Sequence, residues 1–337
     1  MRALLLVLPF IALTFCSWGI YGPVLHVGQE AMDHTSLRPF ICVGLAYFVV
    51  AVLVPILVLR ARGEQGHWTA SGTIWSVSAG VAGAVGALGI IMAFKFGGKP
   101  VYVMPLVFGC APVVNTFVTM GMTRSFRQAG SMFFLGVLLV ALGAAGVMFF
   151  KPGARDVNIV DLTIKQFAMI VSSIALTALC WGAYGPVLHK GQMKMGGSRL
   201  RPFLCVGLAY FAIAVVVPGL VLAGGTEAEA SWSVVGGIWS LAAGAAGALG
   251  ALGIILAFNF GGKPIYVMPL VFGGAPVVNT FTTITAQGTI SQVPIGFYAS
   301  LVCVIIGAVT VLIYAPKPGK KPAASPTSAD RRAAAQV

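Results

Sequence analysis

One segment of the chain occurs twice and decides the fold: Trp18-Gly-Ile-Tyr21-Gly-Pro-Val-Leu-His26-Val-Gly-Gln29. It returns in the second half as Trp181-Gly-Ala-Tyr184-Gly-Pro-Val-Leu-His189-Lys-Gly-Gln192. A second segment, residues 97–119, returns at 261–283 with 20 identities in 23 positions. The sequence therefore indicates an internal duplication, in which each half builds a similar structural unit.

The composition around these repeats is that of a membrane protein. Of 337 residues, 58% are hydrophobic and 9% charged, whereas soluble domains carry about 25% charged residues. Apolar runs of about 20 residues, enough to cross a bilayer, recur ten times: 3–22, 39–59, 73–96, 101–120, 132–150, 167–186, 202–223, 235–260, 265–284 and 294–314. The first run resembles a secretory signal, but Ile11-Ala-Leu-Thr14 recurs as Ile174-Ala-Leu-Thr177 in mid-chain. We therefore expect an all-α, polytopic protein whose first run is a retained span.

The halves set the expected organisation. Residues 1–150 form a first five-span repeat, 151–165 a connecting loop, 166–315 a second five-span repeat, and 316–337 a disordered basic tail. Because five is odd, the second repeat enters the membrane from the opposite side, an arrangement typical of secondary transporters. Most lysines and arginines fall on the side of both termini, which predicts cytoplasmic termini in an inner (plasma) membrane.

The charged residues narrow the function. All eight Asp and Glu lie in expected connections or in the tail, so no carboxylate is available to balance a cation at membrane depth. Neutral or anionic substrates are favoured over hydrophobic cations. The net charge of +13 is spread over connections and tail, which favours membrane orientation over nucleic-acid binding. No metal-ligand spacing or nucleophile–base set is visible, so we expect no enzyme, cofactor or metal site.

Helix-breaking prolines mark the expected substrate site. Gly-Pro steps end the first and sixth runs, and two prolines interrupt the fourth and the ninth; paired interruptions of this kind point to a transporter site. The substrate-binding candidates beside them are Trp18, Tyr21, Tyr102, Asn115, Trp181, Tyr184, Tyr266 and Asn279. An interfacial aromatic belt and simple helix–helix adhesion are the alternatives for these residues.

Three further residues are candidates for charge or proton handling. Lys95 would select anions if it faces the substrate, and would otherwise snorkel to the membrane surface. His26 and His189 are able to titrate near neutral pH, and the alternative for them is a capping or interfacial hydrogen bond.

The pattern resembles the drug/metabolite transporter superfamily, particularly its EamA-type members. The resemblance rests on Trp18-Gly and Trp181-Gly, on Arg38 and Arg201, and on the stretch Ala93-Phe-Lys-Phe to Pro105-Leu and Ala111-Pro112. It implies ten spans, with a substrate cavity lined by spans one to four and six to nine. We expect a secondary carrier for a small polar metabolite, working by alternating access; the alternative is a structural or sensory membrane protein without flux. The expected partners are a small-molecule substrate and the lipid bilayer, and the sequence leaves a homodimer open.

Overall fold

The computed structural model describes residues 2–124, 126–150, 163–227, 231–260, 264–286, 288, 291 and 293–314. In the first half the helices are α1 (Arg2–Glu30), α2 (Leu37–Phe48), α3 (Val54–Arg62), α4 (Ala70–Lys95), α5 (Pro100–Thr123) and α6 (Ser131–Phe149). In the second half they are α7 (Ile164–Lys194), α8 (Leu200–Phe211), α9 (Val217–Ala223), α10 (Val234–Asn259), α11 (Pro264–Ala286) and α12 (Ile295–Ile313). Helices are the only regular elements among the described residues, so the expected all-α class is confirmed.

The helices are long and apolar enough for a membrane. Seven have the length and composition to cross a bilayer, and three shorter apolar helices lie at 131–147, 270–286 and 295–311. Large apolar side chains such as Leu57, Ile74 and Leu220 are 65–70% exposed, as expected for residues that face lipid. The chain is therefore an integral, polytopic membrane protein.

Two helices are longer than the sequence predicts. The Gly-Pro steps predict that the first and sixth spans end at Gly22 and Pro186, but α1 continues to Glu30 and α7 to Lys194. Each helix carries its proline internally, at Pro23 and Pro186. Proline removes a backbone hydrogen bond without always ending a helix, so the prediction of a break was wrong. The connecting loop up to residue 162 and the tail from 315 onward lie outside the described residues.

A short π-helical turn joins two helices in each half. Val49–Leu53 connects α2 to α3, and its counterpart in the repeat, Ala212–Val216, connects α8 to α9. Each turn precedes a proline, Pro55 or Pro218. Proline has no N–H and presses against the carbonyl four residues earlier, and a wider π turn relieves that contact.

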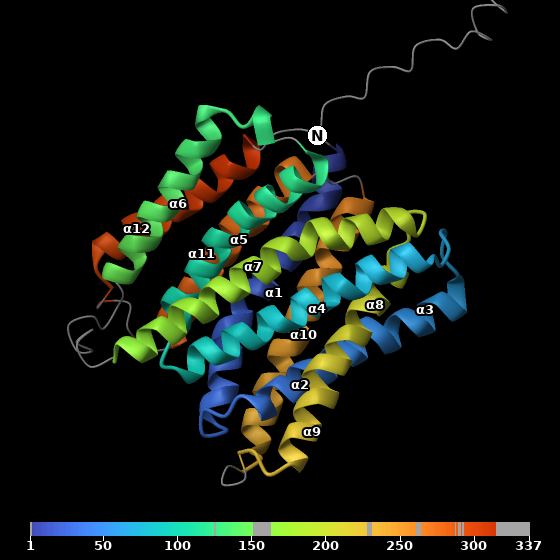
Figure 1. Ribbon diagram of the computed structural model, residues 1–337, viewed down its shortest axis with the longest axis horizontal. Coiled ribbons are helices and arrows are strands. Elements are labelled where there is room, and N and C mark those ends of the chain that lie inside the picture. Colours follow the sequence, from blue (N-terminus) through green and yellow to red (C-terminus); the bar gives the residue numbers. More distant parts are fainter. Residues whose placement is uncertain are drawn as a thin grey trace, which may run out of the picture.

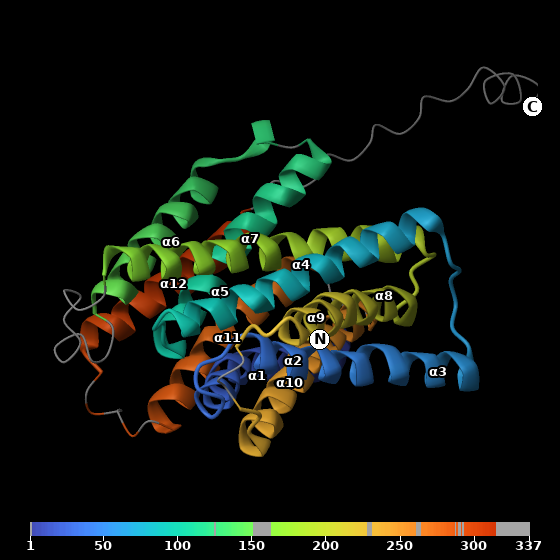
Figure 2. The ribbon, with the colours of Figure 1, turned by 60° about the horizontal axis from the view of Figure 1, so that its bottom comes forward.

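The helices divide into two bundles that mix the halves of the chain. Helix α1 packs on α10 and α11, and we call these three the α1 bundle; helix α7 packs on α4 and α5, which form the α7 bundle. Helix α2 packs along α10, and α8 along α4. Figure 2 shows α4 and α7 side by side on one side of the molecule, with α1 and α10 on the other. Helices α6 and α12 pack together at one edge (Figure 1).

Glycines allow the close packing inside each bundle. A Cβ at Gly250 would collide with the Trp18 indole, and one at Gly86 with the Trp181 indole. The hydroxyl of Thr14 donates to the Gly250 carbonyl at 3.1 Å, and that of Thr177 to the Gly86 carbonyl at 3.0 Å. Small residues at such crossings let helix backbones approach within hydrogen-bonding range in a membrane. They hold the two tryptophans at matching positions in the centre of the molecule.

Candidate functional site

A glutamate marks each of two faces of the molecule. At the Glu227 face, α1 and α4 end and α2 and α5 begin, as the contact of Lys95 with Ser36 and Glu227 shows. At the Glu64 face, α3 and α7 end and α4 and α8 begin, where the Thr69 hydroxyl donates to the Lys194 carbonyl.

A central cavity of about 50 Å³ lies between the two bundles. Its lining is almost entirely aromatic, and both halves of the chain contribute to it: Trp18, Tyr21, Tyr47, Phe108, Trp181, Tyr184, Tyr210 and Phe272, with Gly83, Gly247 and Ala251. The rings of Tyr47 and Tyr210 stack at 3.7 Å with an interplanar angle of 2°. The volume holds a few water molecules, so the walls approach each other closely in this state.

Hydrogen bonds to the backbone hold the two tryptophan rings in place, whereas two tyrosine hydroxyls are available to bond a ligand. The Trp18 indole N–H donates to the Gly247 carbonyl, and that of Trp181 to the Gly83 carbonyl, both at 3.2 Å. In the part of the chain that the structure describes, the buried hydroxyls of Tyr21 and Tyr184 have no protein partner. A buried hydroxyl without a partner costs about 1–3 kcal/mol. A ligand that bonds to these hydroxyls would regain part of that free energy.

A larger cavity of about 450 Å³, which we call the vestibule, adjoins the central one. The two cavities share Trp18, Trp181, Tyr184 and Phe272. The vestibule extends along α5 and α7 to Thr123 and Met193, and Met193 at the Glu64 face is 63% exposed. Ligand sites for small molecules are typically about 300–1,000 Å³, so the vestibule is large enough for a metabolite.

Six of the predicted site residues line these cavities. The central cavity is lined by four of them, Trp18, Tyr21, Trp181 and Tyr184. The other two, Asn115 and His189, line the vestibule.

Asn279 and His26 are the equivalents of Asn115 and His189 in the other half of the chain. They lie toward the Glu227 face and line neither cavity. Asn279 is fully buried, and its side-chain amide donates to the Pro100 carbonyl at 3.0 Å. The His26 ring stacks on Phe94 with centroids 5.1 Å apart, and its Nδ1 lies 3.5 Å from a Glu30 oxygen. The structure therefore separates pairs that the sequence makes equivalent.

The remaining predicted residues lie near the Glu227 face. The Tyr102 hydroxyl donates to the Gly97 carbonyl at 3.2 Å. The Lys95 ammonium donates to the Ser36 hydroxyl at 3.2 Å and lies 3.6 Å from a Glu227 oxygen. In this state Lys95 is thus part of an ion-pair network. The side chain of Tyr266 lies outside the described residues.

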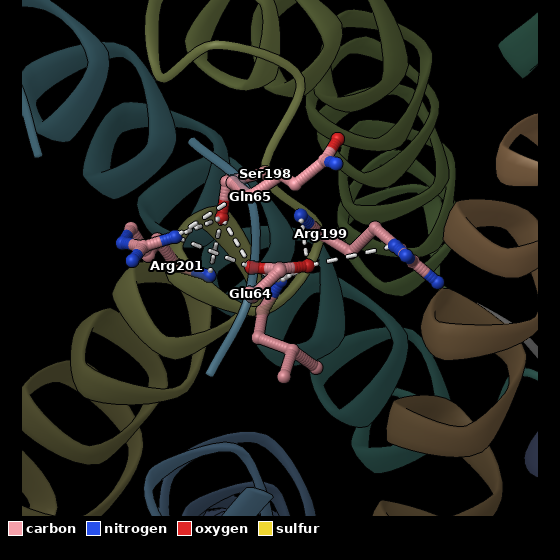
Figure 3. A network of polar contacts seen from close by, with 6 residues as sticks. Glu64, Gln65, Ser198, Arg199 and Arg201 are labelled. Atoms are coloured by element: carbon pink, nitrogen blue, oxygen red, sulfur yellow. Dashed lines mark hydrogen bonds and ion pairs between the residues drawn. The ribbon is translucent and has the colours of Figure 1, made fainter. Parts of the chain in front are cut away.

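Two glutamates have a larger structural role than the sequence predicts. Glu64 accepts hydrogen bonds from the Ser198 hydroxyl at 2.6 Å and the Arg199 N–H at 2.8 Å, and its carboxylate lies 3.5 Å from Arg201. Figure 3 shows this network around the first turn of α8. The side chain of Glu64 is only 7% exposed. Acidic groups at a helix N-terminus are stabilising because the free N–H groups there carry partial positive charge.

Glu227 makes the matching contacts at the first turn of α2. It accepts from the Ser36 N–H at 3.0 Å and the Ser36 hydroxyl at 3.1 Å, and it pairs with Arg38 at 3.4 Å. Glu64 and Glu227 have the same separation in the sequence as Trp18 and Trp181. That shared offset was the signal that could have identified both glutamates.

Tyr47 and Tyr210 also belong to the site although they were not among its predicted residues. They are a repeated pair with that same offset, and each lies in one of the expected apolar spans. No protein-family model matches the chain, and no curated protein matches its sequence.

Proposed function

We propose that the protein is a secondary carrier that moves a small polar, neutral or anionic metabolite by alternating access. One observation carries the proposal: an aromatic cavity between two bundles of equivalent composition connects to one face through the vestibule, while equivalent residues pack together toward the other face. A carrier needs a central site that is reached from one side at a time, and this arrangement provides one.

The proposal includes ten spans arranged as two inverted five-helix repeats. The odd number of apolar runs in each half supports the inversion, because two similar units of five spans would enter the membrane from opposite sides. Matching contacts between equivalent residues support it, because Trp18 bonds Gly247 just as Trp181 bonds Gly83. This pattern is expected when two related units pack about an axis in the membrane plane. Ten spans in two such halves are also what the resemblance to the drug/metabolite transporter superfamily implies.

The orientation follows from the basic residues. Arg60, Arg62, Arg124, Arg127 and Lys194 belong to helix ends and connections of the Glu64 face. Under the positive-inside rule this face is cytoplasmic, so both termini are cytoplasmic in an inner (plasma) membrane. The present state is then open to the cytoplasm.

The linings favour an uncharged or anionic solute. Among the described residues, neither cavity is lined by an aspartate or glutamate. The vestibule has His189 and Lys190, and the Lys190 ammonium lies 3.8 Å from the centre of the Trp75 ring. A cation would therefore meet no counter-charge. Aromatic faces and the free hydroxyls of Tyr21 and Tyr184 suit a solute with one apolar face and several hydrogen-bonding groups.

Flux through purified protein in liposomes tests the proposal. A panel of radiolabelled sugars, amino acids and organic acids would be offered, and we expect uptake of at least one solute that saturates with concentration. Tyr184→Phe removes a hydroxyl at the site and should weaken apparent affinity about fivefold, the effect of one hydrogen bond. Tyr298→Phe on the peripheral helix α12 is the matched control and should leave affinity unchanged. Folded protein that moves no solute of the panel would overturn the proposal in favour of a structural or sensory role.

A further inference from the structure

We propose that paired side-chain amides are the gates of this carrier, and that they exchange roles between its two states. Gln29 and Asn279 close the Glu227 face in the present state, and Gln192 and Asn115 close the Glu64 face in the other. The inference rests on the proposed function and assigns its conformational cycle to named hydrogen bonds.

The first amide bond joins the two bundles through Gln29. Its Nε2 donates to the Ile91 carbonyl at 3.0 Å, and the side chain is fully buried. Gln29 lies in the last turn of α1, and Ile91 lies on α4 of the α7 bundle. The bond therefore forms only when the bundles meet at the Glu227 face.

The second amide bond also crosses between bundles. Asn279 on α11 donates through Nδ2 to the carbonyl of Pro100, the first residue of α5, at 3.0 Å. The stacking of His26 on Phe94 adds an aromatic contact between α1 and α4 on the same side. These contacts close the path from the central cavity to the Glu227 face.

The equivalent groups at the Glu64 face line the vestibule, and among the described residues no hydrogen bond joins them. Gln192 and Ile255 correspond to Gln29 and Ile91 at the offsets of the repeat, and both line the open cavity, as does Asn115. Gln192 is on α7, and Ile255 is on α10 of the α1 bundle. Closing the vestibule would bring the Gln192 amide to the Ile255 carbonyl, and the Asn115 amide to the carbonyl of Pro264.

The bonding of these amides suits a gate that must open again. In the described part of the chain, the side-chain oxygens of Gln29 and Asn279 have no hydrogen-bond partner although they are buried. Each amide thus gains one bond and leaves one acceptor unsatisfied, which limits the net stabilisation of the closed face. Because the other state would form the same two bonds, the two states stay near balance.

Two reporter cysteines, one for each face, measure how accessible that face is. Thr119 on α5 lines the vestibule, whereas its equivalent on α11, Thr283, is 2% exposed. In a background without the six native cysteines, Thr119→Cys and Thr283→Cys would be labelled in proteoliposomes by a membrane-impermeant maleimide added to one side at a time. Unaltered gates should give fast labelling at position 119 from the Glu64 face and slow labelling at position 283 from the Glu227 face.

Removing one amide should shift the two rates in opposite directions. Gln29→Leu should raise labelling at 283 about fivefold, the loss of one ordinary hydrogen bond, and slow labelling at 119. Gln192→Leu should do the reverse, because it weakens only the other state. Asn279→Leu provides a second variant that should act like Gln29→Leu, and thermal unfolding would show that each variant is folded.

Labelling and flux together separate the amide gates from the carrier function. If Gln29→Leu and Asn279→Leu leave both rates unchanged, or shift them in the same direction as Gln192→Leu, the amide gates are wrong even if the protein carries a solute. Reciprocal shifts without solute flux would support the gates and count against the carrier.

Discussion

At both faces of the molecule a glutamate from one half caps the first turn of a helix from the other half. Glu64 binds the start of α8, and Glu227 binds the start of α2. The proposed amide gates differ, because Gln29 is bonded and buried at one face while Gln192 lines an open vestibule at the other. The molecule is therefore symmetric where α2 meets α8 and asymmetric where α1 and α7 end.

This difference assigns different roles to the two regions. In the proposed cycle, contacts present at both faces at once, together with the stacked Tyr47 and Tyr210 rings between them, would stay unchanged when the bundles rock. Contacts present at only one face are those that the proposed cycle would break and reform. We infer that α2 and α8 form the hinge, and that the ends of α1 and α7 form the gates.

Substituting the glutamates should lower the stability of the protein more than any other proposed change, if Glu64 and Glu227 hold the hinge. Glu64→Gln removes a carboxylate from a nearly buried network that includes Arg201, and losing one partner of such a pair costs about 3 kcal/mol. Glu227→Gln should cost a similar amount at the other face. Thermal unfolding in detergent would measure both. Glu30→Gln is the control: its side chain is 55% exposed, and we expect a negligible change.

Equal losses of stability at Glu64 and Glu227 would show that the two faces hold the hinge alike. A loss of stability at one glutamate only would contradict this account, because the hinge would then depend on a single face.

Glycine substitutions should give an intermediate effect, equal in the two halves. Gly86→Ala and Gly250→Ala each place a Cβ against a tryptophan of the central cavity. Overpacking of this kind costs about 2 kcal/mol, and displacing either indole should also weaken substrate binding. Gly237→Ala on α10 is the control, since a Cβ there meets no atom within 4 Å. Unfolding temperature and solute affinity that match the wild type in both variants would contradict the close packing of Trp18 and Trp181.

Substituting Lys95 should give the smallest effect, a modest change in reporter labelling at the Glu227 face. Its ammonium joins α4 to Ser36 and Glu227, while its equivalent in the second half is the neutral Asn259. Lys95→Asn should raise labelling of the Thr283→Cys reporter about twofold, because a half-exposed ion pair contributes only about 0.5 kcal/mol. Asn259→Lys should favour closure of the Glu64 face by a similar factor. Identical labelling in all three proteins would show that Lys95 does not bias the gates.

The sequence was sufficient for the helices and for four residues of the central cavity. Apart from the ends of α1 and α7, apolar length located the long helices to within a few residues. The repeated Trp-Gly-x-Tyr segments supplied Trp18, Tyr21, Trp181 and Tyr184. The helix ends at Gly22 and Pro186 were misplaced because an internal proline does not always end a helix.

The asymmetry between the faces was beyond reach of the sequence. Asn115 and Asn279 are the same residue in nearly identical segments, yet one lines the vestibule and the other is buried. Residue identity determines which contacts are available to both halves, and in the proposed cycle the state of the whole molecule determines which half makes them. The sequence also does not reveal that Glu64 and Glu227 are buried, because each is covered by a helix from the other half of the chain.

Distances between spin labels on the two faces test the central claim most directly. Met193 on α7 and Phe260 after α10 report the separation of the bundles at the Glu64 face, and their equivalents Glu30 and Phe96 report it at the Glu227 face. In liposomes, pulsed electron paramagnetic resonance should find the 193–260 distance longer than the 30–96 distance, with Gln29→Leu shortening the first and lengthening the second. Equal distances at both faces that do not respond to Gln29→Leu would contradict a carrier that opens one face at a time.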